Sequence, residues 1–155
     1  AERMNVDRKE AKELIEGYFT TYPQIKEYMD KSIEIARNQG YVETIFQRKR
    51  YLPDINSRNA TVRGYAERNA INAPIQGSAA DIIKVAMSRI HKQFESNNLK
   101  AKMILQVHDE LNFSVPKAEK AIVEEIVIRE METAFAMQVP LKADCGWGKN
   151  WLEAH

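Results

Sequence analysis

The residues with the clearest capacity for chemistry form one short stretch, His108-Asp109-Glu110. Two adjacent carboxylates beside an imidazole are costly to hold together, because like charges repel. A cation is the usual compensation, and Mg²⁺ prefers carboxylate oxygens while it keeps several waters for a phosphate substrate. Asp109 and Glu110 are therefore candidate metal ligands. For these three residues taken alone, an ordinary solvated turn is the alternative.

The segments on either side of this stretch must position it. An apolar run covers residues 103–107, and apolar and polar residues alternate over 111–115. Both patterns predict strands, so we expect a hairpin with a tight acidic turn at its tip.

A second set of polar side chains recurs at helical spacing. Arg68, Asn72 and Gln76 are four residues apart, which places them on one helix face. Guanidinium and amide groups contact the backbone and the groove acceptors of nucleic acids. A solvated polar stripe is the alternative that spacing alone favours.

The segment from Asn59 to Asn97 is helical by composition, but Pro74 and Gly77 interrupt it. Proline removes a backbone donor and clashes with the preceding turn. The sequence thus predicts one helix that ends near Asn72 and another that starts near Gln76. Ser78 is the expected cap of the second helix, with Asp81 three residues later. The apolar residues Ile82, Ile83, Val85 and Ala86 should then pack beneath the acidic hairpin.

The remaining pattern completes an α+β fold, in which helices pack on a small antiparallel sheet. Asp7 is an expected N-cap, Pro23 opens a second helix, and Gly40 ends it. Residues 41–45 and 49–52 predict a short hairpin. Pro116 should start a helix, whose apolar side comprises Ala121, Ile122, Ile126, Met131 and Phe135. Residues 139–145 predict a last strand.

Composition limits the function classes. The 155 residues suffice for one core, and the net charge of +1 means that any nucleic-acid contact must come from local arrangement. Arg48-Lys49-Arg50 is a short basic run, which is either a solvated hairpin or a phosphate contact. No apolar run approaches the roughly 20 residues needed to span a bilayer. The single cysteine excludes an intrachain disulfide and fits a reducing cytosol.

Two other chemistries find little support. The residues that could bind zinc lack close ligand spacing; they are His91, His108, His155 and Cys145. A hydrolase that pairs Cys145 with His108 would need an activated thiol, whereas an apolar strand setting favours an inert one.

Two long motifs carry a resemblance, namely residues 66–84 (AERNAINAPIQGSAADIIK) and 106–111 (QVHDEL). Together they resemble the C-terminal part of a family A DNA polymerase of the bacterial DNA polymerase I type. Shorter pieces agree in order along the chain; they are Tyr22-Pro23, Tyr41–Thr44, Arg50–Ile55 and Trp151–His155. The resemblance covers essentially the whole chain.

The resemblance implies template-directed DNA synthesis, with two Mg²⁺ ions, a dNTP and primer-template DNA. It implies that residues 1–58 belong to the fingers subdomain and 59–155 to the palm. Asp109 would be a catalytic metal ligand, Glu110 an accessory carboxylate, and His108 would orient the primer terminus. The residues that would contact DNA are Arg68, Asn72, Gln76 and Gln106. A hairpin-stabilising hydrogen bond is the alternative for His108, and sheet packing is the alternative for Gln106.

The chain also departs from the family pattern. The second catalytic aspartate and the cations that hold the triphosphate lie upstream of the matched motifs. We therefore expect a bacterial, cytoplasmic, nucleoid-associated enzyme, of which this chain is a fragment that is inactive alone. We also expect self-association through surfaces that truncation exposes, and no membrane contact. The alternative function is a helical scaffold that binds nucleic acid without chemistry.

Overall fold

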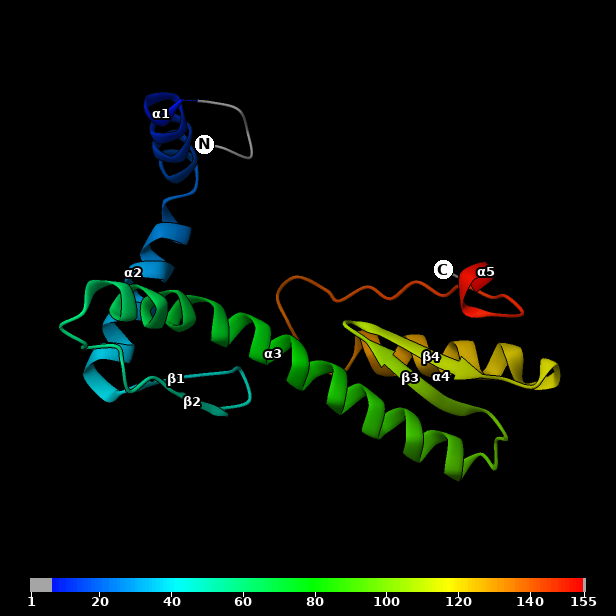
Figure 1. Ribbon diagram of the computed structural model, residues 1–155. Helices are drawn as coiled ribbons and strands as arrows, with labels where there is room; N and C mark the ends of the chain where they lie inside the picture. The colour runs from blue at the N-terminus through cyan, green and yellow to red at the C-terminus, as the bar shows by residue number, and fades with distance from the viewer. Residues whose placement is uncertain (1–6, 155) are drawn as a thin grey trace. The chain divides into compact units, whose positions relative to one another are not determined.

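The computed structural model describes residues 7–154 and confirms the α+β class (Figure 1). His155, which the zinc interpretation included, lies outside the described residues. The helices and strands are α1 (Arg8–Thr21), α2 (Pro23–Gln39), β1 (Tyr41–Glu43), β2 (Lys49–Tyr51), α3 (Ala60–Ser96), β3 (Lys102–Val107), β4 (Glu110–Ser114), the 3₁₀ turn η2 (Lys117–Glu119), α4 (Lys120–Glu132) and α5 (Trp151–Ala154). Within the described residues the strands form two antiparallel pairs, β1 with β2 and β3 with β4.

The chain divides into two compact units, Ala1–Gln76 and Gly77–His155, here called unit 1 and unit 2. In unit 1 the predicted helix ends are confirmed. The Asp7 carboxylate accepts a hydrogen bond from the Glu10 backbone N–H at 2.8 Å and caps α1. Pro23 opens α2, and Gly40 ends it with a φ of 80°, a left-handed conformation that suits glycine.

The core of unit 1 forms where α2, the β1–β2 hairpin and the first half of α3 meet. Its buried side chains are Ala36, Val42, Leu52, Ile55, Ala66 and Ala70. Polar contacts join α2 to α3 beside this core. The Arg37 guanidinium lies 2.6 Å from the Glu67 carboxylate, and the Tyr28 hydroxyl donates to the Ile71 carbonyl at 3.2 Å. The hairpin is thus anchored by its Val42 side.

The predicted break in the long helix is wrong. α3 is one helix from Ala60 to Ser96 with Pro74 inside it, so Ser78 caps no new helix. A proline in a helix interior costs about 3 kcal/mol relative to alanine. Both halves of the helix bury fully enclosed residues, Ala70 in unit 1 and Ile90 in unit 2. We attribute the continuity to this packing, which stabilises helices more than local propensity does.

The predicted end of this helix is confirmed. Asn98 adopts a φ of 51°, and the Leu99 N–H donates to the Phe94 carbonyl at 2.9 Å. Asparagine tolerates the left-handed conformation better than most residues, which explains why the Asn97-Asn98 pair closes α3.

Unit 2 contains the second core, and the predicted packing beneath the acidic hairpin is confirmed. Ile82, Val85 and Ala86 of α3 contribute to this core, as do Leu111 and Phe113 of β4. The buried members are Ala86, Ile90, Phe94, Ala101, Val123, Ile126, Val127 and Ala134. The sheet that carries the acidic turn therefore rests on α3 and α4.

The predicted apolar side of α4 is only partly correct. Ile126 is buried, but Ala121 and Ile122 are exposed, and Val123 and Val127 take their place in the core. Pro116 is followed by the 3₁₀ turn η2, and α4 begins at Lys120. In η2 the Glu119 carboxylate accepts from the backbone N–H groups of Lys100 and Ala101, at 3.0 and 2.9 Å. This contact fixes the start of α4 and so determines which side chains face inward.

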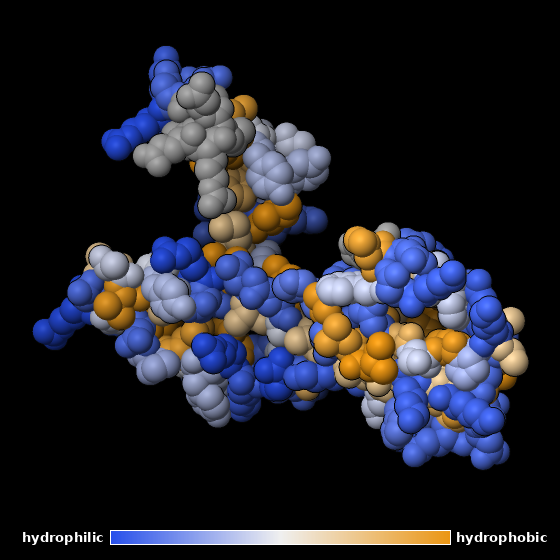
Figure 2. Space-filling model, turned by 45° about the vertical axis from the view of Figure 1, so that its right-hand side comes forward, coloured by the Kyte–Doolittle hydropathy of each residue, from blue (hydrophilic) through white to orange (hydrophobic). Residues whose placement is uncertain are grey.

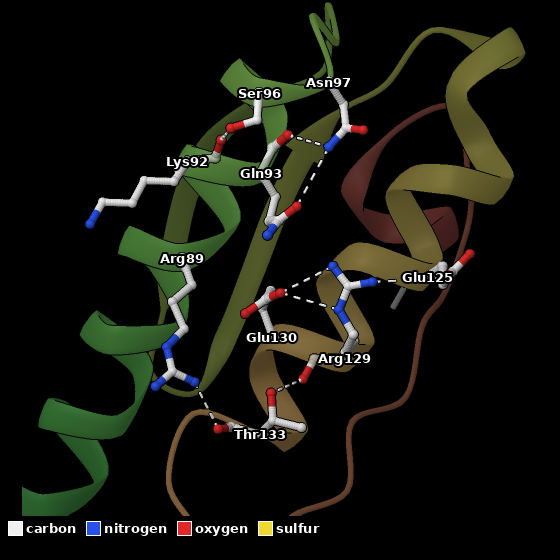
Figure 3. A network of polar contacts seen from close by, with 9 residues as sticks. All are labelled: Arg89, Lys92, Gln93, Ser96, Asn97, Glu125, Arg129, Glu130 and Thr133. Carbon is white, nitrogen blue, oxygen red and sulfur yellow. Dashed lines mark hydrogen bonds and ion pairs between the residues drawn. The ribbon is translucent and has the colours of Figure 1, made fainter.

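A polar network lies at the C-terminal end of α4 (Figure 3). Arg89 of α3 donates to the Thr133 carbonyl at 2.8 Å, just beyond the last turn of α4. Glu130 is 9% exposed, and its carboxylate accepts from Arg129 at 3.1 and 3.2 Å. A cation at a helix C-terminus also interacts favourably with the helix dipole. The network therefore joins α3 to α4 beneath the hairpin.

The predicted last strand is wrong, because residues 139–145 form neither helix nor strand. A strand needs a hydrogen-bonded neighbour, and here the described contacts go to α4 instead. The Ala143 N–H donates to the Glu132 carboxylate at 3.2 Å. The Trp147 indole N–H donates to the Glu124 carboxylate at 2.9 Å.

Candidate active site

The acidic turn is tight, as predicted, and its loop has two residues, while Glu110 belongs to β4. Val107 pairs with Glu110 across the sheet, so His108 and Asp109 form the loop. His108 has a φ of 54°, a conformation that costs a residue with a Cβ roughly 1–2 kcal/mol. The Gln106 side-chain amide donates to the His108 carbonyl at 3.0 Å. Gln106 therefore supports the turn, and this contact is additional to the DNA contact or the sheet packing expected for this residue.

A β-bulge shapes the strand that leads into this turn. Met103 pairs with Phe113 and Leu105 with Asn112, which leaves Ile104 as the extra residue. A bulge re-aims the side chains that follow it. Within the apolar run, Ile104 is 64% exposed and Leu105 is 48% exposed.

The two carboxylates have different surroundings. Asp109 is exposed at the tip, whereas Glu110 is half-buried and accepts a hydrogen bond from the Trp151 indole N–H at 2.8 Å. Trp151 lies in α5, 41 residues further along the chain. Sequence reasoning included Trp151 in a family motif but missed this contact, since no local spacing links a tryptophan to a distant turn.

The donor set fits Mg²⁺ chemically but is small. Asp109 and Glu110 supply the hard carboxylate oxygens that this ion prefers. Within residues 7–154, however, no group of three or more histidine, cysteine, aspartate or glutamate side chains is arranged to hold a metal ion. The described residues therefore provide part of a ligand shell.

A pocket of about 410 Å³ adjoins the acidic turn within unit 2. Asp109, Glu110 and Asn112 line it together with α4 and the segment around Cys145. Burial raises the pKa of the Cys145 thiol, and the nearby Glu124 carboxylate raises it further. A raised pKa keeps the thiol protonated, which agrees with the inert role expected for Cys145.

The predicted polar row on α3 lies within unit 1. Arg68, Asn72 and Gln76 are all exposed, on successive turns of one continuous helix. The Arg68 guanidinium lies 5.8 Å from the centre of the Tyr65 ring, within the range of a cation–π contact. Tyr65 was not among the residues that the four-residue spacing predicted for this row. The row belongs to unit 1 and the acidic turn to unit 2.

Comparison of the whole chain with known families identifies the class of protein. The model of DNA polymerase family A matches residues 1–153. The chain therefore belongs to DNA polymerase family A.

Relatives agree along almost the whole chain. It is 54% identical to the DNA polymerase I of Caldicellulosiruptor bescii over 153 residues, which cover 99% of this chain and 18% of that protein. It is 46% identical to the DNA polymerase I of Bacillus subtilis over 154 residues, with the same two shares. The chain thus spans under a fifth of the length of these relatives.

A solved structure has the same fold. The POL domain of Pol1 from M. smegmatis, in complex with DNA primer-template and dNTP, matches with a TM-score of 0.97 and 42% identity. The match covers 99% of this chain and 27% of that one. No helix among the described residues is long and apolar enough to cross a membrane.

Proposed function

We propose that this chain contributes to template-directed DNA synthesis, in which a nucleotide is transferred from a dNTP to a primer 3′-hydroxyl during replication and repair. The observation that carries the proposal is the acidic turn, whose exposed Asp109 and half-buried Glu110 project from a hairpin anchored on a core. Membership of DNA polymerase family A supports it. So does the likeness to a polymerase domain solved with primer-template and dNTP.

Asp109 and Glu110 are the residues that would hold Mg²⁺. When bound, two such ions lower the pKa of the attacking hydroxyl and stabilise the charge that develops on the phosphate. Asp109 is exposed and available to an ion or a substrate. The Trp151 N–H holds one oxygen of Glu110, which fixes the direction of that carboxylate.

The other candidate residues would position the nucleic acid. His108, exposed at the tip, would orient the primer terminus. Arg68, Asn72 and Gln76 would contact primer and template from the exposed face of α3. Minor-groove acceptors are shared by correct pairs, so amides there can check geometry without reading sequence.

We assign residues 1–58 to the fingers and 59–155 to the palm of such an enzyme. The two compact units divide later, between Gln76 and Gly77, within α3. A bacterial cytoplasmic location, associated with the nucleoid, fits a protein that acts on DNA.

The 155 residues alone support a second function, the binding of nucleic acid without chemistry. The described residues hold two candidate ligands and no larger ligand group. We therefore expect the isolated chain to bind primer-template DNA and to incorporate no nucleotide.

A chimera tests the proposed activity. This chain replaces the matching 153 residues of the C. bescii DNA polymerase I, which is 54% identical over that span. We expect Mg²⁺-dependent primer extension by the chimera. Asp109→Ala should reduce the rate at least about a thousandfold, roughly 4 kcal/mol, and leave primer-template binding nearly unchanged.

Asp54→Ala is the matched control, because Asp54 is also an exposed carboxylate in a turn but lies in unit 1. This control should extend primers at the rate of the unmodified chimera. Near-normal extension by the Asp109 variant would refute the role of Asp109, whereas equal loss in both variants would indicate a folding defect.

A further inference from the structure

Positive charge is concentrated in the β1–β2 hairpin. Residues 41–51 carry three cations, Arg48, Lys49 and Arg50, against one carboxylate, Glu43. The net charge of residues 41–51 is therefore +2, which exceeds the net charge of +1 of the whole chain. All three cations are exposed. The hairpin is therefore a locally positive segment of an otherwise nearly neutral chain.

One face of this hairpin combines aromatic rings with a cation. Tyr41 pairs with Tyr51 and Glu43 with Lys49, so these four side chains share a face. Val42 lies on the opposite face and is buried in the core of unit 1. The face with the two tyrosines thus points away from the core, and Tyr51 is 66% exposed.

The aromatic side chains of this outer face are already arranged by their own contacts. The Tyr41 and Tyr51 rings lie edge to face with centres 5.7 Å apart. The Lys49 ammonium lies 4.4 Å from the centre of the Tyr41 ring. A hydrogen bond with Tyr41 raises the pKa of Lys49 above its ordinary value. The face therefore offers rings and a charge in fixed positions.

The loop that joins the strands is ordered by Thr44. Its buried hydroxyl accepts from the backbone N–H groups of Phe46 and Arg48, at 3.3 and 3.2 Å. The Gln47 N–H donates to the Thr44 carbonyl at 2.8 Å. A ligand would therefore meet a hairpin whose conformational entropy has already been lost, which favours binding.

We propose that the outer face of the β1–β2 hairpin, formed by Tyr41, Lys49 and Tyr51, binds single-stranded nucleic acid. Unpaired bases stack on the tyrosines, and Lys49 with the adjacent Arg48 of the connecting loop contacts the phosphates. Rings beside cations form the usual platform for single strands. A duplex hides its base faces, and an acidic peptide has few rings to stack.

The test uses the 155-residue chain and a fluorescein-labelled oligodeoxythymidylate, followed by fluorescence anisotropy. Tyr51→Ala should weaken binding about tenfold, within the range measured for the loss of one base–aromatic stack. Tyr51→Phe retains the ring and should bind like the unmodified chain. Tyr18→Ala is the control, since Tyr18 is an exposed tyrosine on α1.

Salt dependence separates the cation from the rings. Lys49→Gln should reduce the slope of log K against log salt by about 0.7, the value expected for one phosphate contact with a single strand. Lys12→Gln, on the exposed surface of α1, should leave that slope unchanged. An oligonucleotide with 5-iodouracil should crosslink to a peptide that contains Tyr51.

Three results would overturn the proposal: unchanged affinity of Tyr51→Ala, equal competition by polyglutamate, or crosslinks confined to other segments. Equal competition by polyglutamate would instead indicate a site for acidic polymers in general. The experiment needs neither metal nor dNTP, so its outcome is independent of the proposed activity. Asp109→Ala should bind the oligonucleotide like the unmodified chain.

Discussion

Replacing Ile90 by alanine should destabilise the support of the acidic turn. Ile90 lies in the second half of α3, is 0% exposed, and belongs to the core of unit 2. The change removes three buried carbons, worth about 2.4 kcal/mol at roughly 0.8 kcal/mol each. The cavity adds to this loss, while the better helix propensity of alanine returns about 0.4 kcal/mol. We expect the free energy of unfolding of unit 2 to fall by about 3 kcal/mol.

Tryptophan fluorescence can follow unit 2 by itself. The chain has two tryptophans, Trp147 and Trp151, and both lie in unit 2. In urea, with an m-value of about 2 kcal/mol/M, a loss of 3 kcal/mol lowers the midpoint by about 1.5 M. Ile122→Ala on α4 is the matched control, since Ile122 is 40% exposed. Its midpoint should fall by less than about 0.5 M, because burial is partial and alanine favours the helix.

A fall of less than about 1 kcal/mol for Ile90→Ala would contradict the core described for unit 2. Equal effects of the Ile90 and Ile122 substitutions would contradict the burial that distinguishes the two sites. In native conditions the Ile90 variant should still bind the labelled oligodeoxythymidylate, since the β1–β2 hairpin has its own core in unit 1.

Two other perturbations test the contacts and surfaces of unit 2. In the chimera, Trp151→Phe retains an aromatic side chain but loses the hydrogen bond to Glu110. The Mg²⁺ concentration for half-maximal extension should therefore rise about fivefold, which corresponds to roughly 1 kcal/mol. Trp147→Phe loses a similar bond to Glu124 and should leave that concentration unchanged; equal effects of the two variants would contradict a specific role for Trp151. The exposed Ile104 and Leu105 on β3 favour self-association of the 155-residue chain. Light scattering should detect a dimer, and the substitution Ile104→Lys should abolish the dimer. A monomeric mass at high concentration would contradict that prediction.

The features that sequence predicted correctly depend on local interactions. Asp7 caps the helix that follows it, and Gly40 supplies a left-handed residue. An apolar run and an alternating run define the two strands around residues 108 and 109. The four-residue spacing of Arg68, Asn72 and Gln76 also required only that the segment be helical. Each of these features involves residues a few positions apart, so the sequence alone contains the necessary information.

The features that sequence missed depend on tertiary contacts. Pro74 ends no helix, because buried residues on both sides keep α3 continuous. Residues 139–145 have the composition of a strand, but Lys142 and Ala143 contact the Glu132 side chain of α4. The link between Trp151 and Glu110 spans 41 residues and has no periodic signal. In each case a tertiary contact between residues far apart in the sequence determines the structure, and local conformational preference does not.

The acidic turn shows how this difference affects the proposed site. The sequence predicted that a cation compensates for the repulsion between the adjacent carboxylates. In the structure the protein itself holds the turn, through the Val107–Glu110 pair, the Gln106 amide and the Trp151 indole. Solvent at Asp109 further weakens the repulsion, because charges interact less strongly in water. Ordering the turn would therefore reduce the binding free energy of a metal ion only slightly. The proposed metal site would therefore be arranged before an ion binds, and such pre-organisation suits the positioning that phosphoryl chemistry requires.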